Sequence, residues 1–319
     1  MNILVTGGTG FIGAELTKLL VAQGEKPIVF DIQFRPERMG GIEDKVIQVK
    51  GDVSNLAHVM DVVKKYKIQK IFHLGSMLSV PSDADPASAF HVNAEGTFNI
   101  LEAARILDVE QVLFSSTIAT YGADLQSEVL DDFSIQRPKV FYGCTKVFAE
   151  LMGRFYKHKY GLDFRAVRYP SIPGPGVKTP GIVQYTAWSI EKAIKGEPFT
   201  IWVTPETVVP TMYYKDAALS ILRLSEAPLE SIKMIVYILA GIKPFFSAQT
   251  LVDSIKKYFP AAELNFAPDP IRMEQVKGLA HPIDDHFAVE EFGWECEFSL
   301  EGMIEDFIKM YQENPEKYL

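Results

Sequence analysis

The sequence predicts an α/β fold, in which a doubly wound parallel sheet covered by helices is followed by a smaller C-terminal α/β lobe. Short apolar runs alternate with stretches of helical periodicity through the first half of the chain, the order typical of parallel sheets. A glycine-rich turn joins the first apolar run to the first helical stretch. Proline and glycine cluster over residues 170–176, where we expect a change of domain.

The composition is that of a globular protein with a sizeable buried core. Apolar residues make up 47% of the 319 residues, and the net charge of −9 argues against nucleic acid or an anionic membrane as the main partner. Two cysteines, Cys144 and Cys296, are too few for a disulfide framework. No apolar run reaches the roughly 18 residues of a membrane span. We therefore expect a soluble, cytoplasmic protein.

The first strand, 2–6, and the first helix, 11–23, flank the turn Gly7-x-x-Gly10-x-x-Gly13. Gly7 permits a tight turn, Gly10 lets the backbone approach a pyrophosphate, and Gly13 lets helix and strand pack closely. The start of the helix, at Phe11 and Ile12, supplies free N–H groups for phosphates. This stretch predicts a dinucleotide-binding unit.

The second strand, 27–30, ends at Asp31. A carboxylate at this place accepts hydrogen bonds from a ribose 2′-hydroxyl and repels a 2′-phosphate, which favours NAD over NADP. Arg35 is close enough in sequence to weaken that preference, and an aspartate at a strand end can also simply cap a turn.

The third strand, 46–49, is followed by Asp52 and a helix over 55–66. Asp52 is expected to bond the adenine amino group or, alternatively, to cap that helix. A fourth strand, 70–74, contains His73, which we expect to be a packed core residue. A loop over 75–85, a long helix over 87–107 and a strand over 111–114 follow.

A helix over 142–160 opens with Tyr142 and Lys146, which are four residues apart and so share a face. A neighbouring ammonium lowers the pKa of a phenol because it favours the phenolate. Thr117, at the end of the preceding strand, can bond a substrate oxygen. The three residues predict an acid–base system for oxidising an alcohol or reducing a ketone. Tyrosine and lysine fall four apart on many helices by chance, so the order of the motifs carries the inference.

The second half of the chain is less regular after a strand over 163–168. We assign 1–170 to an NAD-binding domain and 171–319 to a substrate-binding lobe, from which some later segments can return to the first domain. The expected helices and strands of this half lie near 182–195, 199–203, 216–226, 234–239, 248–259, 263–266 and 299–313.

A short acidic and histidine-containing stretch over 281–286 could suggest metal ligands: His281, Asp284, Asp285 and His286. Pro282 and the loop-like surroundings favour a capping cluster instead, and hydride chemistry needs no metal. We therefore expect no metal site.

The glycine turn, Asp31, Thr117 and the Tyr142–Lys146 pair follow one another in an order that resembles the extended short-chain dehydrogenases, which have a Rossmann-type fold. Segments 142–151, 160–165, 168–170, 210–217 and 291–294 are similar to the short-chain type of L-threonine 3-dehydrogenase. The resemblance implies hydride transfer to NAD, with Tyr142 as base, Lys146 lowering its pKa and bonding the nicotinamide ribose, and Thr117 orienting the substrate oxygen. It also implies cofactor contacts at Val53, Leu74, Gly75, Asn93, Tyr169 and Pro170, and a substrate contact at Ser79, for which a solvated loop serine is the alternative.

Two departures from the related families concern the substrate. Val209 and Pro210 stand where nucleotide-sugar epimerases carry an Arg-Asp pair, so the bidentate phosphate donor is missing. Gly181, Ile182 and Val183 open a segment that in threonine dehydrogenases offers two hydroxyls and a carboxylate. We expect a 3-hydroxy acid or a similar secondary alcohol, with threonine turned over slowly.

Alternatives remain open. Ile182 and Val183 can face the core rather than the substrate, with Trp188 on the same expected helix. The protein can be an epimerase or dehydratase that keeps its NAD and shows no net NADH, or a non-catalytic NAD-sensing protein, although the intact Thr117–Tyr142–Lys146 set argues against the last.

The helices 87–107 and 142–160 carry more apolar residues than one sheet contact requires. The resemblance implies that they pair with their copies about a two-fold axis, so that a homodimer is expected; the alternative is that all these side chains face their own sheet. The residues concerned are Phe90, Val92, Phe98, Leu101, Leu107, Phe148, Leu151, Phe155 and Tyr156.

Overall fold

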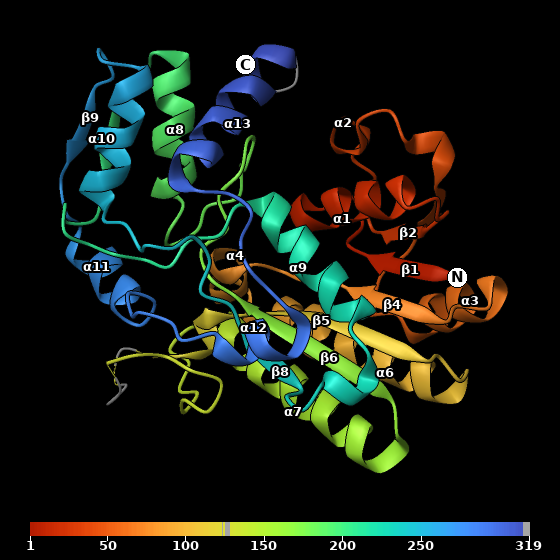
Figure 1. The fold of residues 1–319 in the computed structure, drawn as a ribbon. Helices are drawn as coiled ribbons and strands as arrows, with labels where there is room; N and C mark the ends of the chain where they lie inside the picture. The colour runs from red at the N-terminus through yellow and green to blue at the C-terminus, as the bar shows by residue number, and fades with distance from the viewer. Residues whose placement is uncertain (123, 125–127, 315–319) are drawn as a thin grey trace.

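The computed structural model describes residues 1–122, 124 and 128–314. Its centre is a sheet of seven parallel strands in the order β3-β2-β1-β4-β5-β6-β8 (Figure 1). The strands are β1 (Ile3–Thr6), β2 (Ile28–Asp31), β3 (Ile47–Lys50), β4 (Lys70–His73), β5 (Gln111–Thr117), β6 (Asp163–Tyr169) and β8 (Val236–Ile238). The chain moves outward from β1 to β3 and then outward on the other side from β4, so a crevice is expected at the carboxyl ends of β1 and β4.

Helices cover both faces of this sheet, as Figure 1 shows. One face carries α1 (Phe11–Ala22), α9 (Tyr214–Glu226) and α12 (His286–Phe292), and the other carries α3 (Leu56–Tyr66), α6 (Gly96–Ile106) and α7 (Phe141–Tyr160). Successive strand residues point to opposite faces: Leu4 enters the core under α3 and α6, whereas Ile3 and Val5 enter the core under α1 and α9. The doubly wound α/β fold is confirmed.

The expected helix over 87–107 is helical throughout but changes its winding. It consists of α5 (Pro86–Ala89), a π-helical turn η2 (Phe90–Glu95) and α6. The wider turn contains Asn93, and such turns are frequent at functional sites.

Several short helices lie where the sequence indicated loops. They are α2 (Pro36–Met39), α4 (Ser79–Ala84), α11 (Pro270–Lys277) and α12, together with the 3₁₀ turns η1 (Glu43–Lys45), η3 (Ile118–Thr120) and η4 (Leu229–Ser231). Two of these helices, α2 and α11, begin with proline. Elements of this length are too short to show a helical period in the sequence.

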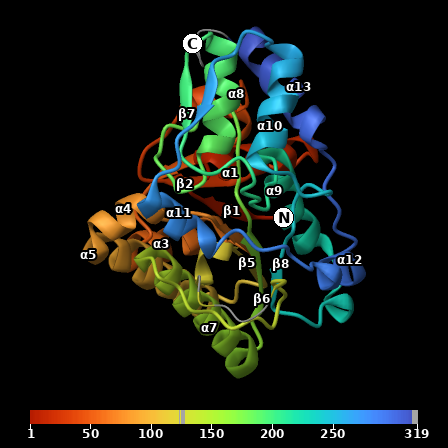
Figure 2. The ribbon, with the colours of Figure 1, turned by 90° about the vertical axis from the view of Figure 1, so that its left-hand side faces the viewer.

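The C-terminal lobe has its own small sheet, in which β7 (Phe199–Ile201) pairs in parallel with β9 (Leu264–Phe266). The helices α8 (Tyr185–Lys195), α10 (Ala248–Tyr258) and α13 (Leu300–Glu313) pack around it, as Figure 2 shows. The core of this lobe reaches the carboxyl edge of the main sheet, because Ile118 belongs to it and Phe11 and Tyr142 pack against it. β8, α9 and α12 come from beyond residue 170 yet belong to the main layers. Within the described ranges, no helix is long and apolar enough to cross a membrane.

Candidate active site

The glycine turn after β1 is closed so tightly that only glycine fits. Gly7 has a φ of +63°, and its carbonyl oxygen accepts a 2.8 Å hydrogen bond from the Gly10 amide. A Cβ at Gly13 would lie 2.1 Å from that same oxygen, and one at Gly7 would lie 2.8 Å from Cα of Gly75. The turn therefore brings bare backbone to the crevice between β1 and β4, as a pyrophosphate requires.

The first turn of α1 fits an anion in two further respects. It carries no acidic side chain, and its N-cap, Gly10, makes no side-chain capping bond. Phe11 anchors this turn by stacking on Tyr214 of α9, with ring centroids 4.9 Å apart. The backbone at Phe11 and Ile12 is thus held in place by the packing of the helix and not by a local cap.

Asp31 lies at the end of β2 with its carboxylate held by Thr9 from the glycine turn. Its Oδ2 accepts from the Thr9 amide at 3.1 Å and from the Thr9 hydroxyl at 2.8 Å. The other oxygen, Oδ1, accepts from the Gln33 amide at 3.3 Å. Arg35 is exposed at the N-cap of α2. The carboxylate is therefore oriented before any ligand binds, by a threonine that sequence reasoning missed.

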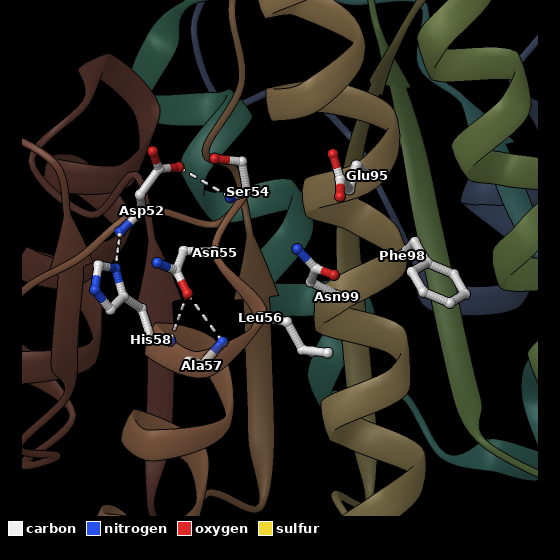
Figure 3. A pocket seen from close by; sticks show the side chains of 9 residues that line it. All are labelled: Asp52, Ser54, Asn55, Leu56, Ala57, His58, Glu95, Phe98 and Asn99. Atoms are coloured by element: carbon white, nitrogen blue, oxygen red, sulfur yellow. Dashed lines mark hydrogen bonds between the residues drawn. The ribbon is translucent and has the colours of Figure 1, made fainter.

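Asp52 does not cap α3, which corrects one of its two expected roles. Its Oδ1 accepts from the Ser54 amide at 2.9 Å, whereas Asn55 caps the helix by accepting from two backbone amides. Asp52 lines an open cavity of about 640 Å³ between the start of α3 and the η2–α6 helix (Figure 3). Val53 is buried beside it, and its carbonyl oxygen accepts from Asn99 at 2.9 Å.

The end of β4 is a buried polar junction. His73 is 1% exposed and bonds to the hydroxyls of Thr6 and Thr97, and burial lowers its pKa to about 3. The prediction of a packed core histidine is confirmed. After it come Leu74 and Gly75, whose amide donates to the Thr6 hydroxyl at 3.2 Å.

Asn93 uses its buried amide to fix the segment after Gly75. Its Oδ1 accepts from the Met77 amide at 2.7 Å, and its Nδ2 donates to the Met77 carbonyl oxygen at 3.1 Å and to Thr145 at 3.2 Å. In this structure Asn93 therefore links the loop beyond β4 to α7, through the π-helical turn that carries it.

Lys146 and Tyr142 meet at the carboxyl end of β5. Lys146 is 2% exposed, and its ammonium donates to the Ser115 carbonyl oxygen at 2.8 Å. The same Nζ lies 5.5 Å from the centre of the Tyr142 ring. Burial lowers the pKa of Lys146 to about 7, which the charge of Glu150 partly opposes.

The electrostatics of Tyr142 differ from expectation. Burial raises the pKa of its phenol above the usual value, and a hydrogen bond with the Ser76 side chain only partly opposes this. The lysine was expected to lower that pKa, but its ammonium is directed to the Ser115 carbonyl oxygen. The free energy needed to remove a phenolate from water is larger than the stabilisation that a lysine in this position provides. Ser76 is a contact that the sequence did not reveal.

Thr117 is the last residue of β5 and turns the chain toward α7. It is half-buried, and its hydroxyl oxygen accepts from the Ala119 amide at 3.1 Å, capping η3. The turn lies directly on α7, since a Cβ at Gly143 would be 2.1 Å from the Ala119 carbonyl oxygen. The fold thus brings Thr117, Tyr142 and Lys146 to one place, beside the strand ends that hold the glycine turn.

Comparison with known proteins agrees with this geometry. Residues 3–240 match the model of the NAD dependent epimerase/dehydratase family. The chain belongs to this family. It is 30% identical over 318 residues to the mitochondrial L-threonine 3-dehydrogenase of Bos taurus, a match that spans 97% of this chain and 82% of the relative. The resemblance to extended short-chain dehydrogenases and the choice of NAD as cofactor are confirmed.

Solved structures give the same picture. The L-threonine dehydrogenase of Phytophthora infestans superposes with a TM-score of 0.89 at 31% identity, over 98% of this chain and all of that one (100%). A monomeric L-threonine 3-dehydrogenase from a metagenome superposes with a TM-score of 0.87 at 27% identity, over 98% of this chain and 99% of that one. This chain is an NAD-dependent enzyme of the extended short-chain type.

The segment between β4 and β5 contacts the start of α7. Ser79, half-buried, begins α4 and is not a loop residue. Asp83 of the same helix accepts from the Phe141 amide at 2.8 Å, which satisfies a free N–H at the start of α7. This tie between α4 and α7 had no signal in the sequence beyond an aspartate in an expected loop.

Tyr169 and Pro170 follow the end of β6 on the other side. The Tyr169 hydroxyl donates to the Ala217 carbonyl oxygen at 2.7 Å, and the side chain is buried between sheet and α9. Because its side chain is buried and already bonded, Tyr169 can offer only its backbone to a ligand.

The expected substrate wall precedes α8 and is not part of it. Gly181, Ile182 and Val183 are half-buried, and α8 begins only at Tyr185. The Ile182 carbonyl oxygen accepts from the indole of Trp202 at 3.0 Å. Ile182 and Val183 pack against the core of the lobe, as does Trp188, whose indole donates to the Val177 carbonyl oxygen at 2.9 Å.

The acidic stretch over 281–286 makes ordinary structural bonds. Asp285 pairs with Lys243 at 2.6 Å and accepts from the Ala240 amide at 3.0 Å. Asp284 accepts from the His286 amide at 3.1 Å. Across the described residues, no group of three or more potential metal ligands lies together.

Proposed function

We propose that this enzyme oxidises the secondary alcohol of a small 3-hydroxy acid or 3-hydroxy amino acid, using free NAD. The observation that carries the proposal is the convergence of Tyr142, Lys146 and Thr117 at the end of β5, next to the glycine turn. An acid–base residue within reach of a nucleotide crevice is what hydride chemistry requires.

In the proposed mechanism Tyr142 removes the hydroxyl proton while Thr117 orients the substrate oxygen. NAD, when bound, would supply the hydride acceptor. Because burial raises the pKa of Tyr142, the phenolate depends on positive charge around it. Lys146 provides such a charge while it is protonated, and Ser76 donates toward the phenol oxygen.

The proposed substrate class follows from the wall of the lobe. Ile182 and Val183 offer aliphatic groups, and the backbone oxygen of Ile182 is already used by Trp202. A zwitterionic amino acid would leave its ammonium unpaired there, which costs binding free energy. We therefore expect a 3-hydroxy acid to be preferred to L-threonine.

A direct test is NADH formation by the purified protein over 3-hydroxy acids, L-threonine and nucleotide sugars. Net NADH in excess of enzyme with a 3-hydroxy acid supports the proposal. Efficient oxidation of L-threonine, with a KM in the low millimolar range or below, would show that the altered wall is structural. Conversion of a sugar without net NADH would identify an epimerase instead.

We also propose a homodimer formed by α6, α7 and their copies. Five apolar side chains of the segment 90–98 and of α7 are 42–58% exposed: Phe90, Phe98, Phe148, Leu151 and Phe155. Leu101 and Tyr156 are buried, so the alternative that all these side chains face their own sheet fails for the five. An apolar surface of this kind favours association.

Light scattering tests the dimer. The wild type is expected to have twice the chain mass, and Leu151→Glu to have the chain mass alone. Ile271→Glu is the matched control, since Ile271 is 75% exposed on α11. A monomeric wild type at micromolar concentration would reject the dimer, and one related dehydrogenase is indeed monomeric.

We infer a reducing compartment, the cytoplasm, from the thiols. Cys144 is exposed and Cys296 half-buried, and both are free. Thiols of this kind persist where glutathione keeps them reduced. Alkylation under denaturing conditions, in freshly lysed cells without reductant, should label Cys144 fully; a thiol that is unreactive until reductant is added would contradict the inference.

A further inference from the structure

Behind the catalytic residues lies a buried carboxylate that the mechanism above does not use. Glu150 is on α7, one turn after Lys146, and is 3% exposed. It accepts hydrogen bonds from the hydroxyl of Ser116 and, at 2.9 Å, from Gln136. Arg168 donates to it from Nε at 3.1 Å and from Nη2 at 2.8 Å.

The partners of Glu150 belong to the segments that build the active site. Ser116 stands between Ser115, which receives the Lys146 ammonium, and Thr117. Arg168 is the residue before Tyr169 in β6, and Gln136 lies in the segment that leads to α7. One helix therefore reaches two successive residues of β5, with Lys146 and with Glu150, and this fixes the place of Thr117 relative to α7.

The charges around this cluster are few. Arg168 also donates to the Tyr121 hydroxyl at 2.7 Å and to the Asp132 carbonyl oxygen at 3.4 Å. Burial raises the pKa of Tyr121 and brings that of Asp132 to about 7, so the phenol is neutral near pH 7 and the carboxyl only partly charged. His73, on the other side of Lys146, is neutral as well. Among the described residues, the charge that acts on Lys146 is that of Glu150.

We propose that Glu150 is a positioning residue for the reaction, which holds Lys146 against β5 and favours the protonated form of its amine. It acts through Lys146 and does not touch the substrate. The inference rests on the role of Lys146 in the proposed function. Removing an anion beside a cation favours loss of the proton.

The test is a titration of Lys146 by NMR in protein labelled with ¹³C at the lysine ε-carbon, which needs neither substrate nor activity. Glu150→Gln should lower the pKa of Lys146 by about 1 or more from its value of about 7. Glu150→Asp keeps the charge and should restore most of the wild-type value. Glu191→Gln, which removes the same charge from the pair with Lys195 on α8, should change nothing.

Glu150→Gln leaves Arg168 buried and unpaired, so it can unfold. The double variant Glu150→Gln/Arg168→Met removes both charges, and replacing a buried pair in this way is often tolerated. The lowered Lys146 pKa should persist in it, because Arg168 is not among the charges that act on Lys146.

The pH profile of kcat/KM separates this inference from the proposed function. Its alkaline limb should move to lower pH in Glu150→Gln, by about the same amount as the Lys146 titration. An unchanged Lys146 titration in the folded variants, with or without lost activity, would overturn the inference. A shifted titration in an enzyme that oxidises no alcohol would support the role of Glu150 and refute the proposed function.

Discussion

The carboxyl edge of the main sheet and the wall of the C-terminal lobe are built by different means. At the sheet edge, strand ends fix the functional groups: Gly7 and Gly13 admit no side chain, and Lys146 is held to Ser115 by a 2.8 Å bond. In the lobe, Ile182 and Val183 lie in a turn before α8, held by a backbone bond to Trp202 and by aliphatic packing. At the edge, a side chain at Gly7 or Gly13 would collide with backbone, whereas Ile182 and Val183 in the wall are only half-buried. Under the proposed function, the edge carries the chemistry and the wall determines the choice of substrate.

The largest effect is expected for Tyr142→Phe, which removes one oxygen from the sheet edge. Loss of the acid–base group should lower kcat about 10²–10⁴-fold and leave NAD affinity nearly unchanged. Tyr156→Phe, on the same helix α7, is the control. The Tyr156 phenol lies away from the strand end and donates to Glu102 of α6 at 2.5 Å. Steady-state kinetics and cofactor titration measure both. A wild-type kcat in Tyr142→Phe would break the assignment.

The second largest effect is expected for Gly13→Ala. This variant tests the difference between the sheet edge and the lobe with the addition of a single methyl group. The new Cβ would lie 2.1 Å from the Gly7 carbonyl oxygen, and overpacking of this kind costs about 1–3 kcal/mol. NAD should bind about 10–100-fold more weakly. Gly302→Ala in α13 of the lobe meets its nearest atom at 3.4 Å and should leave NAD binding unchanged. Calorimetry that finds equal NAD affinities for the two variants would show that the turn adapts.

These two regions also differ in how much the sequence reveals. At the edge, Gly7, Gly10 and Gly13 sit between a strand and a helix, and that context fixes their backbone role. Tyr142 and Lys146 share a helical face by spacing alone. The pattern was therefore sufficient to predict the doubly wound parallel sheet and the helix that carries both Tyr142 and Lys146.

The sequence could not reveal the contacts between segments that are distant in the chain. Thr9 holds Asp31 and Asp83 caps α7 only because distant segments meet, and neither contact leaves a local pattern. The raised pKa of Tyr142 depends on burial by the lobe, which spacing cannot show. In the lobe, Ile182 was expected inside a helix that in fact begins at Tyr185, because a short turn has no period to recognise.

A third prediction concerns cofactor choice at the edge. Asp31→Asn should weaken NAD about tenfold and improve NADP, because it removes a charged acceptor and its repulsion of a 2′-phosphate. Thr9→Val removes the hydroxyl that donates to Asp31 at 2.8 Å and should give a smaller change in the same direction. The ratio of kcat/KM for the two cofactors is the measurement. A wild type that already prefers NADP would contradict the role of Asp31.

The smallest effect is expected in the wall, from Ile182→Thr/Val183→Thr. Two hydroxyls near the substrate should raise kcat/KM for L-threonine about tenfold. This factor corresponds to the free energy of roughly one hydrogen bond to a charged group. Ile271→Thr, at a 75% exposed position of the same lobe, is the control. If the double variant only loses thermal stability, the two side chains stabilise the core of the lobe, and the wall does not determine the choice of substrate.

The central claim is that residues at the carboxyl edge of the sheet catalyse the net oxidation of an alcohol with free NAD. The most direct measurement is the number of NADH molecules formed per active site by the wild type and by Tyr142→Phe, with a 3-hydroxy acid in excess. The account predicts many turnovers for the wild type and almost none for the variant. NADH that never exceeds one per site in the wild type, with NAD retained by the protein, would contradict it.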